Sequence, residues 1–226
     1  SETGCNFTHL LRIEQNFLII MIKNLIFDLG GVILNIDFQL TISAFHKMGI
    51  QNINELFSAY SQNEFFNDFD KGLINPDEFR KEIRKRLSDN FSDEQIDEAW
   101  NAMLLDFPTQ NINFLLSVKS KYRTFLLSNT NAIHFPVYNK QLNDKYHIPH
   151  LSLLFEKAYY SYLEGLRKPD IEIFEKVLLE NKLMPEETLF IDDSTHNTAT
   201  AEKLGINTIT LESPKTLTEM VIRKIF

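Results

Sequence analysis

Cysteine is almost absent from this chain of 226 residues, because Cys5 is its single cysteine. No internal disulfide is therefore possible, and such cysteine usage is typical of a reducing compartment, so we expect a cytoplasmic protein. An excess of basic residues is also missing, since 23 lysines and arginines stand against 31 aspartates and glutamates, giving a net charge of −8. This balance argues against nucleic acid as the main partner.

Long apolar runs are missing as well. The apolar segment 17–22 is followed directly by Lys23. This segment is too short for a membrane span, and it lacks the basic leader and cleavage site of a signal peptide. Hydrophobic residues make up 43% of the chain and charged residues 24%, as in a globular protein with one core and room for a small insert. Met21 stands directly ahead of the first predicted strand, so we expect residues 1–20 to be an N-terminal extension.

The residues that are present are organised around one stretch near the start. Asn24–Phe27 is a short apolar segment that predicts a buried strand. Asp28 follows where that strand ends, and in open α/β sheets ligands bind outside the carboxyl ends of the strands. Gly30 and Gly31 allow the backbone to turn sharply and to approach a ligand closely. Alone, an aspartate at this place is as compatible with a turn or a helix cap as with catalysis.

Residues 38–107 have a different character, because strand signals vanish and helix signals replace them. Asn75-Pro76-Asp77-Glu78 and Ser92-Asp93-Glu94-Gln95 are both capping boxes, each followed by apolar residues at helical spacing. Two earlier helices are predicted near residues 40–48 and 53–60. This segment is therefore expected to be a helical insert, with Trp100 as an anchor of its core rather than a wall of a substrate pocket.

From Pro108 onwards, strand and helix patterns alternate. Strands are predicted at 124–127, 157–160, 188–191 and 206–210, and helices at 111–121, from about 131, at 170–181 and at 195–204. Such alternation predicts an α/β fold with a parallel sheet covered on both faces. Residues 21–37 and 108–226 would then form one core domain that is interrupted by the insert 38–107.

Three further polar clusters follow the predicted core strands. Ser128-Asn129 ends a strand and precedes a helix, which is suited to holding an anion. Lys168 precedes Pro169 near a helix start, where a cation is favoured if an anion lies close by; Arg167 beside it is interpreted as surface. Asp192-Asp193 ends another strand, and two adjacent carboxylates are best held by a cation, here Mg²⁺ rather than Zn²⁺.

The four clusters together contain the groups that phosphoryl transfer requires. Attack by Asp28 would give an aspartyl-phosphate that water then hydrolyses. Mg²⁺ would reduce the repulsion between nucleophile and phosphate, while Ser128 and Lys168 would hold the remaining phosphate oxygens. Each cluster taken alone also has a plain structural explanation as a turn or a cap.

In their chain order, these motifs resemble those of the haloacid dehalogenase superfamily of aspartate-nucleophile hydrolases. The resemblance rests on four segments: Phe27-Asp28-Leu29-Gly30-Gly31-Val32, Leu127-Ser128-Asn129-Thr130, Arg167-Lys168-Pro169-Asp170 and Ile191-Asp192-Asp193-Ser194. It implies a Rossmann-like sheet with the first strand central and a four-helix cap formed by the insert. It also implies that Asp28, the Gly30 carbonyl and Asp192 hold Mg²⁺, with Asp193 joining the metal site through water, and that Ser128, Asn129 and Lys168 bind phosphate.

Gly30 departs from the pattern of the superfamily's phosphatases, which usually carry a second aspartate there as general acid. A general acid contributes about 10²- to 10⁴-fold to the rate. The chain is similar in this to a bacterial branch that acts on α-D-glucose 1-phosphate, whose anomeric oxygen is a good leaving group. We therefore hypothesise a preference for such substrates, with Asp37 and His134 as alternative proton donors that are equally compatible with structural roles.

The sequence thus predicts a Mg²⁺-dependent phosphatase acting on a small-molecule phosphate ester, with a sugar phosphate as the expected substrate. A 2-haloacid dehalogenase is the nearest rival, but it uses no metal and would not need the acid pair Asp192-Asp193. A non-catalytic phosphate-binding or scaffold protein is the rival from another class, and Gly30 is the feature in its favour. The oligomeric state stays open.

Overall fold

The computed structural model describes residues 21–50, 64–87, 90–212 and 217–225, so the predicted extension 1–20 and the helix predicted at 53–60 lie outside the described residues. The centre of the fold is a parallel sheet with the strand order β3-β2-β1-β4-β5. Its strands are β1 (Asn24–Phe27), β2 (Arg123–Ser128), β3 (Lys157–Tyr160), β4 (Thr188–Asp192) and β5 (Asn207–Thr210). The predicted α/β fold with a parallel sheet and a central first strand is confirmed.

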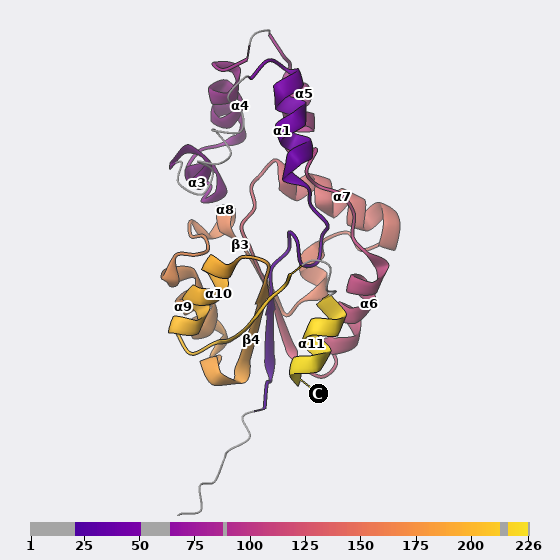
Figure 1. The fold of residues 1–226 in the computed structure, drawn as a ribbon, viewed down its shortest axis with the longest axis vertical. Helices are drawn as coiled ribbons and strands as arrows, with labels where there is room; N and C mark the ends of the chain where they lie inside the picture. Colours follow the sequence, from indigo (N-terminus) through magenta and orange to yellow (C-terminus); the bar gives the residue numbers. More distant parts are fainter. Residues whose placement is uncertain (1–20, 51–63, 88–89, 213–216, 226) are drawn as a thin grey trace, which may run out of the picture.

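Helices cover both faces of this sheet (Figure 1). One face packs against α6 (Thr109–Val118), α7 (His134–Tyr146) and α11 (Leu217–Ile225), and the other against α9 (Ile171–Asn181) and α10 (Thr195–Lys203). Side chains alternate along β1, so Leu25 and Phe27 enter the first core and Ile26 the second. Burial on both faces explains why the core strands are continuous apolar runs in the sequence.

Short elements complete the core domain. They are the helix α8 (Ser161–Glu164) and the 3₁₀ turns η1 (Leu151–Leu154) and η2 (Pro185–Glu187). The C-terminal helix α11 has no counterpart among the elements predicted from the sequence. Within the described parts of the chain, none of the helices combines the length and apolar character that crossing a membrane requires.

The insert stands above the carboxyl ends of the strands in Figure 1. Its described helices are α1 (Phe38–Lys47), α3 (Glu64–Asp70), α4 (Pro76–Arg84) and α5 (Asp93–Asn101). Both predicted capping boxes are present, at the starts of α4 and α5. The insert has an aromatic core of its own, in which Phe66, Phe69 and Phe79 surround Trp100. Trp100 is fully buried there, which confirms its predicted role as a core anchor.

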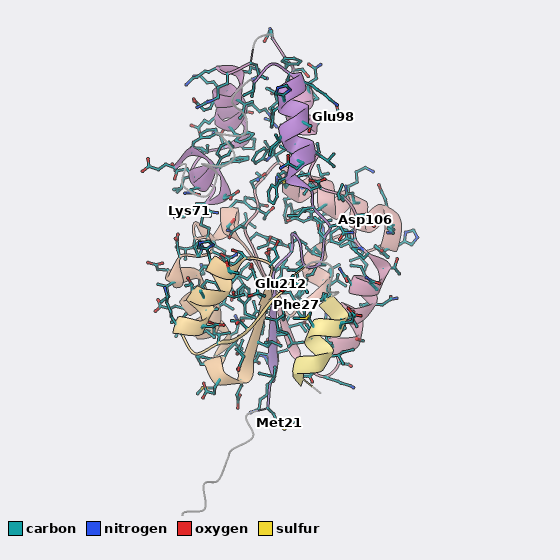
Figure 2. The ribbon with its side chains drawn as sticks, in the orientation of Figure 1. Met21, Phe27, Lys71, Glu98, Asp106 and Glu212 are labelled. Carbon is teal, nitrogen blue, oxygen red and sulfur yellow. The ribbon has the colours of Figure 1, made fainter. Side chains whose placement is uncertain are left out.

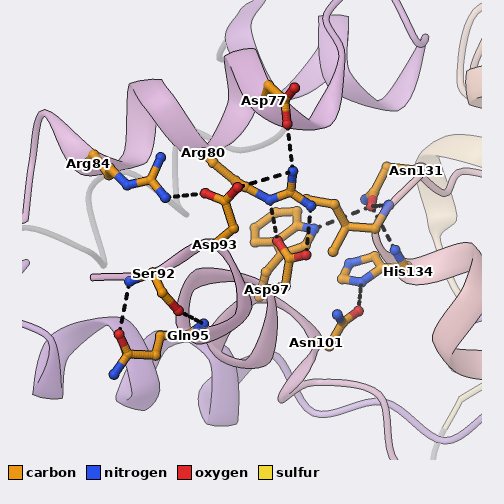
Figure 3. Close-up of polar contacts among 12 residues, drawn as sticks. Asp77, Arg80, Arg84, Ser92, Asp93, Gln95, Asp97, Asn101, Asn131 and His134 are labelled. Atoms are coloured by element: carbon orange, nitrogen blue, oxygen red, sulfur yellow. Dashed lines mark hydrogen bonds and ion pairs between the residues drawn. The ribbon is translucent and has the colours of Figure 1, made fainter. Parts of the chain in front are cut away.

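Ion pairs join α4 to α5 within the insert (Figure 3). The Arg80 guanidinium donates two hydrogen bonds to the Asp97 carboxylate, at 2.9 and 2.8 Å, and a third to Asp77 at 2.8 Å. A bidentate contact of this kind fixes the orientation of both side chains. The insert is therefore held together by polar contacts at its rim as well as by its aromatic core.

Candidate active site

The register of the sheet brings three of the predicted motifs to one edge. Phe27 pairs with Leu126 of β2 on one side and with Ile191 of β4 on the other. Asp28 follows directly, and its N–H donates to the Ile191 carbonyl at 2.9 Å. The end of β2, with Ser128, and the end of β4, with Asp192, therefore flank the aspartate that ends the central strand, as expected for a ligand site in a parallel sheet.

Lys168 joins the two aspartates at this edge. Its Nζ lies 2.6 Å from an Asp28 carboxylate oxygen and 2.6 Å from an Asp192 carboxylate oxygen. The side chain is only 1% exposed, so this ammonium is held in place by the two charges. The sequence placed Lys168 at a helix cap, but α9 begins at Ile171 with Asp170 as its N-cap. Pairing with carboxylates, rather than a helix terminus, explains the buried lysine.

Asn129 holds the backbone of Lys168 in position. Its side-chain Nδ2 donates to the Lys168 carbonyl at 2.8 Å, and its Oδ1 accepts from the Lys168 N–H at 2.9 Å. The residue also lines the cavity above Asp28, so its predicted contact with phosphate stays a prediction. Ser128 is buried at the end of β2, where its hydroxyl donates to the Asn129 carbonyl at 3.4 Å, and its predicted role in phosphate binding likewise stays a prediction.

The protonation of this cluster depends on cations. Burial raises the pKa of Asp28 to about 7, even though Lys168 opposes the rise, and the neighbouring carboxylates of Asp192 and Asp193 add to it. Partial desolvation and the neighbouring Asp192 carboxylate raise the pKa of Asp193 above its usual range, although the residue as a whole is exposed. For Lys168, burial alone would lower the pKa, but the two aspartates outweigh it and keep the ammonium protonated. A further cation at the site would favour the ionised form of Asp28.

The three carboxylates are arranged to supply that cation site. One oxygen each of Asp28, Asp192 and Asp193 lies within 4.8 Å of the other two. Asp192 is fixed by hydrogen bonds from the Ser194 N–H at 2.8 Å and from the Asn197 amide at 2.9 and 3.1 Å. An all-oxygen donor set with an uncompensated negative charge fits Mg²⁺. The predicted participation of the Gly30 carbonyl stays a prediction.

Gly31 is required by the position of Asp193. Its φ is +72°, and a Cβ atom at this residue would lie 2.2 Å from an Asp193 carboxylate oxygen. We expect Gly31→Ala to displace that carboxylate and to weaken Mg²⁺ binding about tenfold or more, the range found when groups that orient metal ligands are changed. Isothermal titration calorimetry with Mg²⁺ measures the effect.

Gly165→Ala is the matched control, because Gly165 has a φ of +68° and a Cβ there would meet no atom within 4 Å. This variant carries the same backbone strain without the clash. Equal Mg²⁺ affinities for the two variants would show that Asp193 takes no part in metal binding.

A cavity of about 580 Å³ opens above the cluster. Residues of the predicted motifs and their flanks line it: Asp28, Gly30, Asn129, Lys168, Pro169, Asp193, Ser194 and Asn197. It is completed by residues for which no functional role was predicted: Ile36, Phe38, Asp70, Arg167 and His196. A Cβ at Gly30 would lie 3.1 Å from the tip of the Ile36 side chain. A side chain at this position would therefore be crowded by the apolar Ile36.

Asp37 and His134, the two alternative proton donors, are not among the described residues that line the cavity. Asp37 caps α1, where its carboxylate accepts from the Gln39 N–H at 2.9 Å. His134 is stacked on Trp100, with ring centroids 5.1 Å apart, and its Nδ1–H donates to Asn101 (Figure 3). Burial lowers the pKa of His134 to about 3, so the imidazole is neutral at physiological pH. Both residues have structural roles, and the hypothesis that either donates a proton is not supported.

The fold and these motifs define the class of protein. The haloacid dehalogenase-like hydrolase family matches residues 25–211, and the chain belongs to this family of enzymes. It is 31% identical over 201 residues to the D-ribitol-5-phosphate phosphatase of Bacteroides thetaiotaomicron, covering 85% of this chain and 93% of the relative.

Two solved structures have the same fold along nearly their whole length. One is a haloacid dehalogenase family enzyme of Bacteroides thetaiotaomicron in complex with magnesium and inorganic phosphate, with a TM-score of 0.78 and 42% identity, covering 88% of this chain and 98% of that chain. The other is a predicted hydrolase of the same kind from Porphyromonas gingivalis, with a TM-score of 0.82 and 30% identity over 91% and 98% of the two chains.

Proposed function

We propose that this enzyme is a Mg²⁺-dependent phosphatase that hydrolyses the phosphate ester of a small sugar or sugar alcohol. The observation that carries the proposal is the group formed by Asp28, Lys168, Asp192 and Asp193. Asp28, Lys168 and Asp192 are buried, and Asp28, Lys168 and Asp193 line the cavity. The similarity to a ribitol-phosphate phosphatase, and to an enzyme solved with magnesium and phosphate, supports the same chemistry.

In the proposed reaction, an Asp28 carboxylate oxygen attacks the phosphorus, and the bond between phosphorus and the alcohol oxygen breaks. The departing oxygen takes its proton from solvent water. Lys168 balances the negative charge that gathers around the phosphoryl oxygens. Water then attacks the phosphorus of the aspartyl-phosphate, releasing inorganic phosphate and restoring the Asp28 carboxylate. Asp28, Asp192 and Asp193 would hold Mg²⁺, which when bound neutralises charge on the phosphate.

Gly30 gives the departing alcohol no proton, so the rate should depend on how well the leaving group tolerates negative charge. This reasoning favours an anomeric phosphate such as α-D-glucose 1-phosphate over a primary ester. The relative named for D-ribitol 5-phosphate supports the primary ester instead. A primary ester could still react faster than an anomeric one if the enzyme contacts the hydroxyl groups of the substrate in the transition state.

The test is phosphate release from D-ribitol 5-phosphate, α-D-glucose 1-phosphate, n-pentyl phosphate and an aryl phosphate, with Mg²⁺ and with a chelator. We expect Mg²⁺-dependent release, with both sugar-derived esters preferred to pentyl phosphate. Equal rates for pentyl phosphate and α-D-glucose 1-phosphate would remove the leaving-group argument. The absence of release from all four would contradict the proposed function and favour a phosphate-binding protein without catalysis.

A further inference from the structure

An unusual pair of charged residues lies in the cavity outside the carboxylate–lysine cluster. Asp70 is the last residue of α3 in the insert, and Arg167 directly precedes Lys168 in the core domain. Both line the cavity that contains Asp28. The Asp70 side chain is 3% exposed and that of Arg167 11%, so the sequence-based interpretation of Arg167 as a surface residue is wrong.

Arg167 and Asp70 lie near each other at a distance longer than a hydrogen bond. The nearest guanidinium nitrogen of Arg167 lies 3.8 Å from an Asp70 carboxylate oxygen, whereas close arginine–carboxylate contacts are about 2.7–2.9 Å. Arg80 and Asp97 in the same insert reach 2.8 Å. The buried Nε of Arg167 has no hydrogen-bond partner. A buried donor in this state is costly unless a ligand satisfies it.

The spacing of the pair is held by its neighbours. Lys71, labelled in Figure 2 where the insert faces the core domain, forms an ion pair with Asp170 at 2.8 Å. Gly72 approaches α8 so closely that a Cβ there would lie 2.2 Å from the Tyr162 carbonyl oxygen. Asn129 fixes the backbone of the residue after Arg167. The chain directly after Asp70 is therefore docked on the core domain, through Lys71 and Gly72.

The hydrogen-bonding properties of Asp70 and Arg167 determine which chemical group of a substrate can bind between them. A guanidinium only donates hydrogen bonds and a carboxylate only accepts them, whereas a hydroxyl does both. A hydroxyl between the two residues can accept from Arg167 and donate to Asp70. A second phosphate or carboxylate on the substrate would gain from Arg167 but would be repelled by the buried charge of Asp70.

We propose that Asp70 and Arg167 together bind hydroxyl groups of the substrate and so select polyhydroxylated phosphate esters, a proposal that rests on the phosphatase function above. Ile36 and Phe38 line the same cavity and offer an apolar surface to the carbon chain. Because Asp70 comes from the insert and Arg167 from the core domain, substrate hydroxyls would contact both parts of the enzyme at once.

The experiment compares kcat/KM for D-ribitol 5-phosphate with kcat/KM for n-pentyl phosphate, which has the same chain length and a primary leaving group but no free hydroxyl. We expect the wild-type enzyme to prefer the ribitol ester. Asp70→Asn and Arg167→Met should each lower the ratio about 10- to 100-fold, the value of a hydrogen bond to a charged group, mainly through KM for the ribitol ester. Arg167→Lys should retain part of the ratio.

Lys71→Met is the matched control, since it removes the neighbouring ion pair between insert and core domain without changing a residue that lines the cavity. Its ratio should stay close to that of the wild type. An equal fall in Lys71→Met would show that docking of the insert, and not hydroxyl binding, sets the preference, and would overturn the proposal.

The remaining outcomes separate this proposal from the function on which it rests. A wild-type enzyme that hydrolyses both esters at equal kcat/KM, or preference for a bisphosphate over the ribitol ester, would overturn hydroxyl selection while leaving the phosphatase in place. This wild-type comparison decides the matter even if a variant does not fold. No Mg²⁺-dependent release from either ester would overturn both proposals.

Discussion

Asp28→Asn is expected to lower phosphate release by at least about 10³-fold, because an amide is a poor nucleophile and covalent catalysis is lost as a unit. The substitution preserves the size of a side chain that is nearly buried, and Lys168 keeps its contact of 2.6 Å with Asp192. The fold should therefore persist while the chemistry stops. Steady-state phosphate release, with thermal unfolding as a check on folding, measures the effect.

Asp144→Asn provides the matched control, because Asp144 on α7 is an exposed carboxylate that pairs with Lys140. Its rate should stay within about twofold of wild type, as is usual for surface changes. If the Asp28 variant were as active as this control, Asp28 would not be the nucleophile, and the reaction would need another attacking group.

Lys168→Met is expected to be the most destabilising single change at the site. It leaves Asp28 and Asp192 buried without the ammonium that lies 2.6 Å from each of them. Removing one partner of a buried ion pair costs about 3–5 kcal/mol, which corresponds to roughly 6–20 °C in Tm for a chain of this size. Phosphate release should fall as well, since a charge that opposes the developing phosphoryl charge is lost.

Mg²⁺ should recover part of the stability of Lys168→Met, because a cation bound to the folded state offsets the same carboxylate charges. Urea unfolding with and without Mg²⁺ measures both effects, and Lys140→Met, which changes an exposed lysine on α7, is the control. A variant as stable as Lys140→Met in the absence of Mg²⁺ would show that the buried carboxylates are not charged in the folded enzyme.

The sequence was sufficient to predict the core strands and the motifs that end them. Strands buried on both faces are continuous apolar runs, and in a parallel sheet the residues after those runs meet at one edge. Asp28 and Asp192 could be assigned to one site for this reason, and the register of β1 with β4 confirms that their strands are neighbours. Capping boxes likewise located α4 and α5 because their signals are local.

Such local sequence patterns do not predict contacts between segments that are distant in the chain. Arg167 has no local feature that distinguishes it from a surface residue, and only the docking of α3 places Asp70 beside it. His134 follows a functional motif in the sequence, yet its burial against Trp100 decides its role. The helix-cap explanation of Lys168 was wrong because α9 begins only at Ile171, and the side chain pairs instead with Asp28, which follows β1, and with Asp192 at the end of β4.

The most direct test of the proposed chemistry is a search for phosphate on Asp28 itself. The enzyme is mixed with Mg²⁺ and its best substrate, quenched in acid during the first turnover, and digested for mass spectrometry. We expect a phosphoryl group on the peptide that contains Asp28, formed and lost within one turnover and absent from Asp28→Asn. Phosphate release by the wild-type enzyme without any phosphoryl group on Asp28 would contradict the covalent mechanism.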